Sequence, residues 1–395
     1  MTLSTLGERV RRLRAERGMT QEQLAERAGV SVDLVKKLEQ GRRESARLTT
    51  LTKLAQALDV SRSELLDRRS RLDGGTSPLV LGLRDVLLSV DVLAGIDPCD
   101  DSGEPTPLDA LRLQVDRSWD DYWNGRFLSL AEALPALIGE ARITHRALGE
   151  PAAKSLAEAY QLAGCLLVHL GQDDLAALAA ERGLRAANTG SDELQWAAVN
   201  GTYSWTLIAQ GRHDEARRLA DQVSTRIEPR LSTASPEHLT VWGGMVLWAL
   251  AAAVEGGRDD AASHYISLAG AGAARMERDR HDYSLNFGPT QVAMQATYAH
   301  AMLGRPDKAL VEAERVRRDD LYTISYGRHL LDVAQAHADS RHVDLAAARL
   351  QEAKDEAPVW FRHQPRARDL VANLAQRQSR LTPILRDHVN SQQPN

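Results

Sequence analysis

Hydrophobic residues recur every three to four positions along most of the chain, which is the spacing of amphipathic α-helices. No alternation of apolar and polar residues is long enough to indicate a β-strand. The pattern therefore predicts an all-α protein. It breaks at residues 70–78 and again at 97–107, where proline, glycine and acidic residues gather. We expect a first domain at 1–70, a linker at 71–106 with one helix and an acidic, proline-containing loop, and a second helical domain at 107–390.

The stretch at residues 20–43 predicts two short helices joined at a glycine. Thr20 and Gln23 have the spacing of a capping box, and Ser31 can cap the second helix. Gly29 is expected to end the first helix in the left-handed conformation, which costs other residues a steric clash. The inner face of the second helix comprises Leu34, Val35 and Leu38. Its outer face comprises Val32, Asp33, Lys36, Lys37 and Gln40.

These residues resemble the helix-turn-helix of the XRE family of bacterial and phage repressors, over about residues 6–66. Ala25, Gly29, Glu39 and Gly41 fall where that family has them. The resemblance implies a five-helix, lambda-repressor-like domain whose second motif helix enters the major groove. It also implies base contacts by Val32, Asp33 and Lys36 and phosphate contacts by Gln21, Lys37, Arg42 and Arg43. The alternative is a domain of this shape used only for protein contact.

Net charge divides the chain in a similar way. Residues 1–69 carry 15 lysines and arginines against 10 aspartates and glutamates, whereas the remaining residues carry 34 against 44. A basic head on an acidic body favours contact between nucleic acid and the head alone.

The second domain repeats itself. Similar segments begin at Gly125, Gly171, Gly211, Gly257 and Gly304, and a sixth begins at Ser340 with one extra residue, at spacings of 46, 40, 46, 47 and 36 residues. In the second to fifth segments, an aspartate follows the glycine by three residues and an alanine by five. We expect the glycine to end one helix, the aspartate to cap the next, and the alanine to let the two approach closely. The alternative is a helical bundle without superhelical order.

This pattern resembles the tetratricopeptide repeat, although the spacing exceeds that family's usual period. The resemblance implies a superhelix whose concave groove comes from the first helix of each pair. The position six residues before each segment then faces the groove, namely Trp119, Cys165, Trp205, Ala251, Tyr298 and Ala334. Further expected groove residues are Tyr122, Trp123, Glu158, Gln161, His169, Gln291, Met294 and His337. Such a surface suits a peptide or small molecule, and core packing is the alternative for each residue.

No motif for a catalytic, metal or cofactor site is found. Cys99 and Cys165 have no spacing that indicates a disulfide framework or a zinc site. The most apolar run, at residues 241–254, is too short to span a bilayer, and the first residues lack the apolar core of a signal peptide. We therefore expect a cytoplasmic protein that is not an enzyme, needs no cofactor or metal, and does not contact a membrane.

An XRE-like head followed by helical repeats resembles the Rgg and PlcR kind of peptide-pheromone receptor used in quorum sensing, and actinobacterial XRE–tetratricopeptide regulators. The resemblance implies a transcriptional regulator that binds double-stranded DNA as a homodimer on a two-fold operator. A peptide or small molecule in the groove would be its effector. Such receptors often clamp the peptide with asparagines, but here Asn200 falls off the expected groove face and Asn286 and Asn373 lie outside it. Alternatives are an adaptor whose repeats bind a partner protein, with DNA binding secondary, and an enzyme such as a phosphatase.

Overall fold

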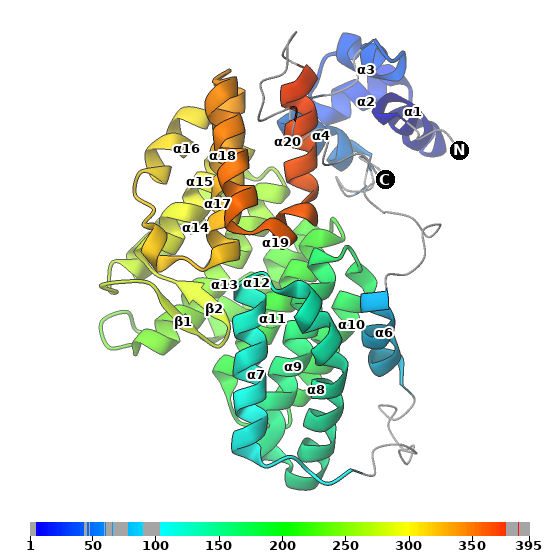
Figure 1. Cartoon of the computed structure of the whole chain (residues 1–395). Helices are drawn as coiled ribbons and strands as arrows, with labels where there is room; N and C mark the ends of the chain where they lie inside the picture. Colours follow the sequence, from blue (N-terminus) through cyan, green and yellow to red (C-terminus); the bar gives the residue numbers. More distant parts are fainter. Residues whose placement is uncertain are drawn as a thin grey trace.

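The chain forms an all-α structure with one short β-hairpin, which confirms the predicted fold class (Figure 1). The computed structural model describes residues 5–42, 46, 48–58, 60, 65, 78–89, 103–376 and 386.

Four helices form the N-terminal head, namely α1 (Leu6–Glu16), α2 (Gln21–Ala28), α3 (Val32–Glu39) and α4 (Leu48–Ala57). The predicted capping box of Thr20 and Gln23 is confirmed, and the hydroxyl of Ser31 accepts the amide of Leu34. Gly29 ends α2 in the left-handed conformation with φ of 59°. Of the predicted fifth helix, the structure describes Leu65, which is helical and fully buried.

One helix of the predicted linker is present as α6 (Pro78–Leu88), which packs on the body. The apolar stretch at residues 79–96 predicts a single helix that extends to residue 96, and residues 90–96 lie outside the described part of the chain, as does Cys99.

Six helical hairpins build the body between residues 103 and 376. Their helices are α7 (Leu108–Trp123) with α8 (Phe127–Leu148), α9 (Glu150–His169) with α10 (Asp173–Ala187), α11 (Glu193–Ala209) with α12 (His213–Arg226), α13 (Pro236–Glu255) with α14 (Asp259–Ala273), α15 (Pro289–Met302) with α16 (Pro306–Ala313), and α17 (Thr323–Asp339) with α18 (Val343–Glu356). A 3-10 turn, η2 (Arg318–Asp320), precedes α17, and α19 (Pro358–Arg362) and α20 (Pro365–Gln376) follow α18. The first helices of neighbouring hairpins contact each other, which stacks the hairpins side by side (Figure 1).

The same turn ends the first helix of all six hairpins. Its left-handed residues are Gly125, Gly171, Gly211, Gly257, Gly304 and Arg341, with φ between 64° and 81°. In each turn the next amide donates to the carbonyl five residues earlier, as in a Schellman motif. The predicted glycine positions are therefore confirmed, and Gly257 rather than Gly256 is in register. In the sixth segment the turn lies at Arg341, one residue after the predicted Ser340.

The prediction that an aspartate caps each second helix is wrong. The residue after the left-handed one is the N-cap, and its side chain makes no capping hydrogen bond. Each aspartate is instead the second helical residue, where a carboxylate is stabilised by the helix dipole; these are Asp174, Asp214, Asp260 and Asp307. The predicted alanines are at most 1% exposed, which confirms the close approach; these are Ala176, Ala216, Ala262 and Ala309.

The row of hairpins closes on itself. Helix α7 of the first hairpin contacts α17 of the sixth, and the rings of Trp123 and Tyr322 stack with centroids 5.2 Å apart. A two-stranded antiparallel hairpin, β1 (Arg280–Asp282) and β2 (Leu285–Phe287), packs on α13. Phe287 reaches the α13 backbone because Gly243 has no Cβ, which would lie 2.3 Å from its ring. The sequence pattern did not indicate these strands.

Helix α13 lies at the centre of a cluster of buried apolar residues to which α11, α12, α14, α15 and β2 also contribute. Its length and composition would allow it to cross a membrane, but 78% of its most apolar window is buried inside the protein. The helix therefore has the burial expected of a core helix.

Candidate functional site

The outer face of α3 presents exposed polar side chains. Lys36 lies 3.3 Å from Glu22 of α2, and Lys37 lies 2.7 Å from Asp33 on its own helix. All four side chains are about half exposed or more, so these ion pairs can exchange for contacts with phosphates. Val32 is half-buried against the head core and Arg42 is exposed. Arg43 lies outside the described residues.

A buried ion pair fixes α3 against the other head helices. The guanidinium of Arg14 in α1 donates to both carboxylate oxygens of Glu39, at 2.7 and 2.9 Å, and the amide of Gln21 donates to the same carboxylate at 2.7 Å. Burial opposes ionisation of Glu39, but the hydrogen bonds from Arg14 and Gln21 outweigh it and hold its pKa below the ordinary value. Gln21, a predicted phosphate contact, thus also connects α2 to α3.

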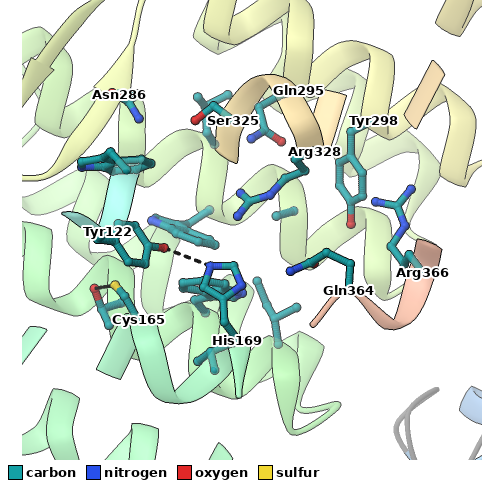
Figure 2. A pocket seen from close by; sticks show the side chains of 18 of the residues that line it. Tyr122, Cys165, His169, Asn286, Gln295, Tyr298, Ser325, Arg328, Gln364 and Arg366 are labelled. Atoms are coloured by element: carbon teal, nitrogen blue, oxygen red, sulfur yellow. Dashed lines mark hydrogen bonds between the residues drawn. The ribbon is translucent and has the colours of Figure 1, made fainter. Parts of the chain in front are cut away.

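A cavity of about 530 Å³ lies inside the ring of hairpins (Figure 2). The first helix of every hairpin contributes to its wall, and the turn between β1 and β2 and the start of α20 complete it. This volume is in the range of sites that hold a small molecule or a few amino-acid residues.

Apart from the two alanines, the prediction names twelve groove residues, and ten of these line this one cavity. They are Trp119, Tyr122, Trp123, Gln161, Cys165, His169, Trp205, Gln291, Met294 and Tyr298. Ala251 also lines it, between Trp205 and Tyr298 in the series of hairpins. Glu158 and His337 do not line the cavity, and Ala334 is fully buried in the core. Ala334 was counted from Ser340, whereas the turn lies at Arg341; the position counted from Arg341, Gln335, does not line the cavity either.

Aromatic rings form much of the wall. Trp205 and Trp248 stack with centroids 5.7 Å apart, and His169 meets Trp205 edge-on at 5.1 Å. The Tyr122 hydroxyl and His169 Nε2 share a hydrogen bond of 3.2 Å. Burial, together with the charges of Arg328 and His363, holds the pKa of His169 well below its ordinary value. His169 is therefore neutral, and this side of the cavity can take a flat apolar group.

Charged groups from α13, α17 and α20 also line the cavity. The Tyr298 hydroxyl donates to Glu255 at 2.5 Å, and Arg366 of α20 donates to Asp332 of α17 at 2.6 Å. Arg328, also on α17, points into the cavity, with its guanidinium 5.8 Å from the Trp205 ring (Figure 2). Figure 2 also shows Gln295, Ser325 and Gln364 around this space.

Several wall residues were missed by the sequence patterns. Trp248 and Arg328 lie on first helices, three and six residues before Ala251 and Ala334, the positions used to place the groove. Asn286 was placed outside the groove, yet it lines the cavity from β2. Asn200 is off the wall as predicted, because its amide donates to the Trp196 carbonyl within α11. No repeat signal covers Arg366.

The cavity does not present the groups of a nucleophilic or metal site. Burial raises the pKa of the Cys165 thiol to about 12, and its sulfur lies 3.7 Å from the Thr202 hydroxyl. A thiol of this kind is a poor nucleophile. Among the described residues, no three His, Cys, Asp or Glu side chains gather as a metal site would require.

A helix-turn-helix domain model matches residues 5–67. The HTH-type transcriptional regulator y4dJ of Sinorhizobium fredii (strain NBRC 101917 / NGR234) is 42% identical over 71 residues, which are 18% of this chain and 91% of that protein. This relative is therefore about as long as the head of the present chain.

Two solved structures are also similar. PlcR of Bacillus thuringiensis in complex with the peptide PapR7 and DNA is 14% identical, covers 70% of this chain and 100% of its own, and has a TM-score of 0.26. The apo form of the competence regulator ComR from Streptococcus vestibularis is 14% identical, with coverage of 94% and 98% and a TM-score of 0.19. TM-scores of this size do not establish a common fold. The head carries the assignment, and this chain belongs to the family of HTH-type transcriptional regulators.

Proposed function

We propose that this transcriptional regulator binds its operator through the head and responds to a ligand held in the cavity of the body. The observation that supports this most strongly is the cavity itself, walled by all six hairpins within a chain whose head is a helix-turn-helix. A closed ring of this size suits a small molecule or a short peptide better than a partner protein, which would need an open face. The cavity therefore favours a ligand sensor over an adaptor that binds a partner protein.

On DNA, we assign base contacts to Val32, Asp33 and Lys36. Phosphate contacts then fall to Gln21, Lys37, Arg42 and Arg43. The exposed lysines at one end of α3 and the buried Arg14–Glu39 pair behind them support this assignment. Because a single head buries little surface on DNA, we propose a homodimer on a two-fold operator.

The division at 1–70, 71–106 and 107–390, with tetratricopeptide-like repeats in the last part, belongs to the same proposal. So does a cytoplasmic location, where an operator is accessible. We assign the chain no enzymatic role, and the effector remains either a peptide, as in quorum sensing, or another small molecule.

One contact offers a route from the cavity to the head. Glu255 lines the cavity and bonds to Tyr298, and it stands two residues before Gly257 in the turn that ends α13. A methyl group added at Gly257 would lie 3.2 Å from the side-chain nitrogen of Gln56 in α4, so the head rests on this turn. A ligand that displaces Tyr298 or Glu255 would therefore act on a turn that the head touches.

The proposal is tested by operator binding with and without ligand. The protein is purified from its own cells, and the molecules released on denaturation are identified by mass spectrometry. Affinity for a duplex selected from a random pool is then measured with and without them. We expect a change of at least about fivefold, the lower end of typical allosteric coupling. Equal affinities with a ligand that demonstrably binds would refute ligand control.

A further inference from the structure

Arg328 is a cavity arginine that forms no hydrogen bond and no ion pair with any residue that the structure describes, and its guanidinium lies 5.8 Å from the Trp205 ring. Its charge still acts on Asp332, four residues along α17, because burial raises the pKa of Asp332 and the charges of Arg366 and Arg328 oppose the rise. A half-buried cation in such a place is costly unless an anion joins it. The ring contact offsets only part of that cost, because cation–π attraction weakens toward 6 Å.

The carboxylates of the cavity wall do not fill this role, because each has another partner. Glu255 accepts from the Tyr298 hydroxyl at 2.5 Å, and Asp332 accepts from Arg366 at 2.6 Å. The wall also holds Arg366 and Arg368. Arg366 is paired with Asp332 and Arg368 has an interaction of its own, which leaves the guanidinium of Arg328 as the surplus charge that no ion pair of the described residues neutralises.

The surplus charge lies next to a flat apolar surface. Trp205, over which Arg328 lies, stacks on Trp248 with an interplanar angle of 26°. Ala251 lines the wall beyond these rings and leaves space, since its side chain is small. A ligand that meets both features at once has an anionic group joined to a planar apolar group.

We propose that the cavity binds an aromatic carboxylate, with the carboxylate paired to Arg328 and the ring on Trp205 and Trp248. This rests on the proposed function, because it specifies the ligand of the same cavity. Two sources share this chemistry, namely a free aromatic acid and the C-terminal carboxylate of a short peptide that ends in an aromatic residue.

The test compares each acid with its amide, which has the same shape but no charge. Isothermal titration of the full chain uses indole-3-acetate against indole-3-acetamide, and N-acetyl-Leu-Phe against its C-terminal amide. We expect at least one acid to bind about tenfold or more tightly than its amide, since charge-assisted bidentate hydrogen bonds are about twice as strong as neutral ones. The acid that binds more tightly identifies the source. Equal binding of acid and amide, or no binding of either acid up to millimolar concentration, would overturn the proposal.

Variants of Arg328 test whether this residue is responsible for the preference for the acid over the amide. Arg328→Gln should reduce the ratio of acid to amide affinity to about one, and Arg328→Lys should retain a preference for the acid because it keeps the charge. Arg315→Gln is the matched control, since Arg315 is 65% exposed, pairs with Glu312 and lies outside the cavity wall. An unchanged ratio in a folded Arg328→Gln protein would contradict the role of Arg328. If an acid binds through Arg328 but operator affinity does not change, the proposed function fails while this inference stands.

Discussion

At the scale of single residues, the six turns that end the first helices differ at one position. Five have glycine in the left-handed region, whereas the sixth has Arg341 with φ of 64°. A side chain in this conformation costs about 1–2 kcal/mol, which glycine avoids. Glycine also has more freedom in the unfolded chain, which offsets part of that gain.

We therefore expect Arg341→Gly to raise the free energy of unfolding by about 0.5–1 kcal/mol in urea titrations. The reverse change at an equivalent turn, Gly171→Ala, should lower it by about 1 kcal/mol, since nothing lies within 4 Å of an added Cβ there and only backbone strain changes. A loss of stability in Arg341→Gly would show that the arginine side chain contributes more than the strain costs.

The environment of Glu158 opposes the negative charge of its carboxylate. Burial raises its pKa to about 7; Asp116 and Asp192 add to the shift and Lys154 opposes it. The folded pKa lies above the ordinary value of 4.5, so stability from this group is present below about pH 4.5 and is lost as the pH rises through 7.

Glu158→Gln should remove the loss of stability that accompanies ionisation of Glu158. The wild-type free energy of unfolding should fall by about 1–3 kcal/mol relative to the variant between pH 5 and 8, as a shift of this size implies after some solvent screening. Glu132→Gln, which removes an exposed carboxylate from α8, is the control. Parallel pH profiles for wild type and Glu158→Gln would contradict the assigned shift.

At the scale of elements, the helices and turns could be predicted from the local sequence, whereas their packing could be predicted only in part. The capping box at Thr20, the left-handed glycines and the buried alanines each depend on a few neighbouring residues, and the sequence predicted them. The β-hairpin was missed because its strands have three residues each and its turn is made by Tyr283 and Ser284, with φ of 53° and 61°, rather than by glycine.

Helices α1 and α3 approach each other closely in the head. A Cβ at Gly7 would lie 1.9 Å from the carbonyl oxygen of Leu38, so only glycine permits this approach. Gly7→Ala should destabilise the head by about 1–3 kcal/mol, as overpacking does, and weaken operator binding. Gly139→Ala in α8, where an added Cβ meets nothing within 4 Å, should raise stability by about 0.5–1 kcal/mol through helix propensity and leave operator binding unchanged. Calorimetry and operator titration of the two variants test this, and equal behaviour would refute the tight approach.

At the scale of the whole molecule, closure of the ring turns an expected open groove into a cavity. The contact between α7 and α17 joins residues about 200 positions apart, and no repeat signal specifies it. The repeat register nevertheless identified eleven residues of the wall, because one face of each first helix points inward whether the ring is open or closed. Asn286 and Arg366 come from elements outside the repeats, so the register could not find them.

The contact of Gln56 with the turn at Gly257 belongs to this scale too. Gln56→Ala should leave ligand affinity unchanged and reduce the effect of ligand on operator binding, because it alters a side chain through which the head meets the body. Lys53→Ala on the same helix, also exposed, is the matched control. Full coupling in Gln56→Ala, measured as the ratio of operator affinities with and without ligand, would exclude this contact as the route.

The central claim, that the state of the cavity controls the head, is tested most directly by filling the cavity with a side chain. Ala251→Trp places an indole between Trp205 and Tyr298, while Ala147→Trp places one on the exposed face of α8. Operator affinity of each variant is measured with and without the molecules released from the purified native protein. We expect Ala147→Trp to respond like the wild type and Ala251→Trp to have one affinity under both conditions. An undiminished response in a folded Ala251→Trp protein would contradict the claim.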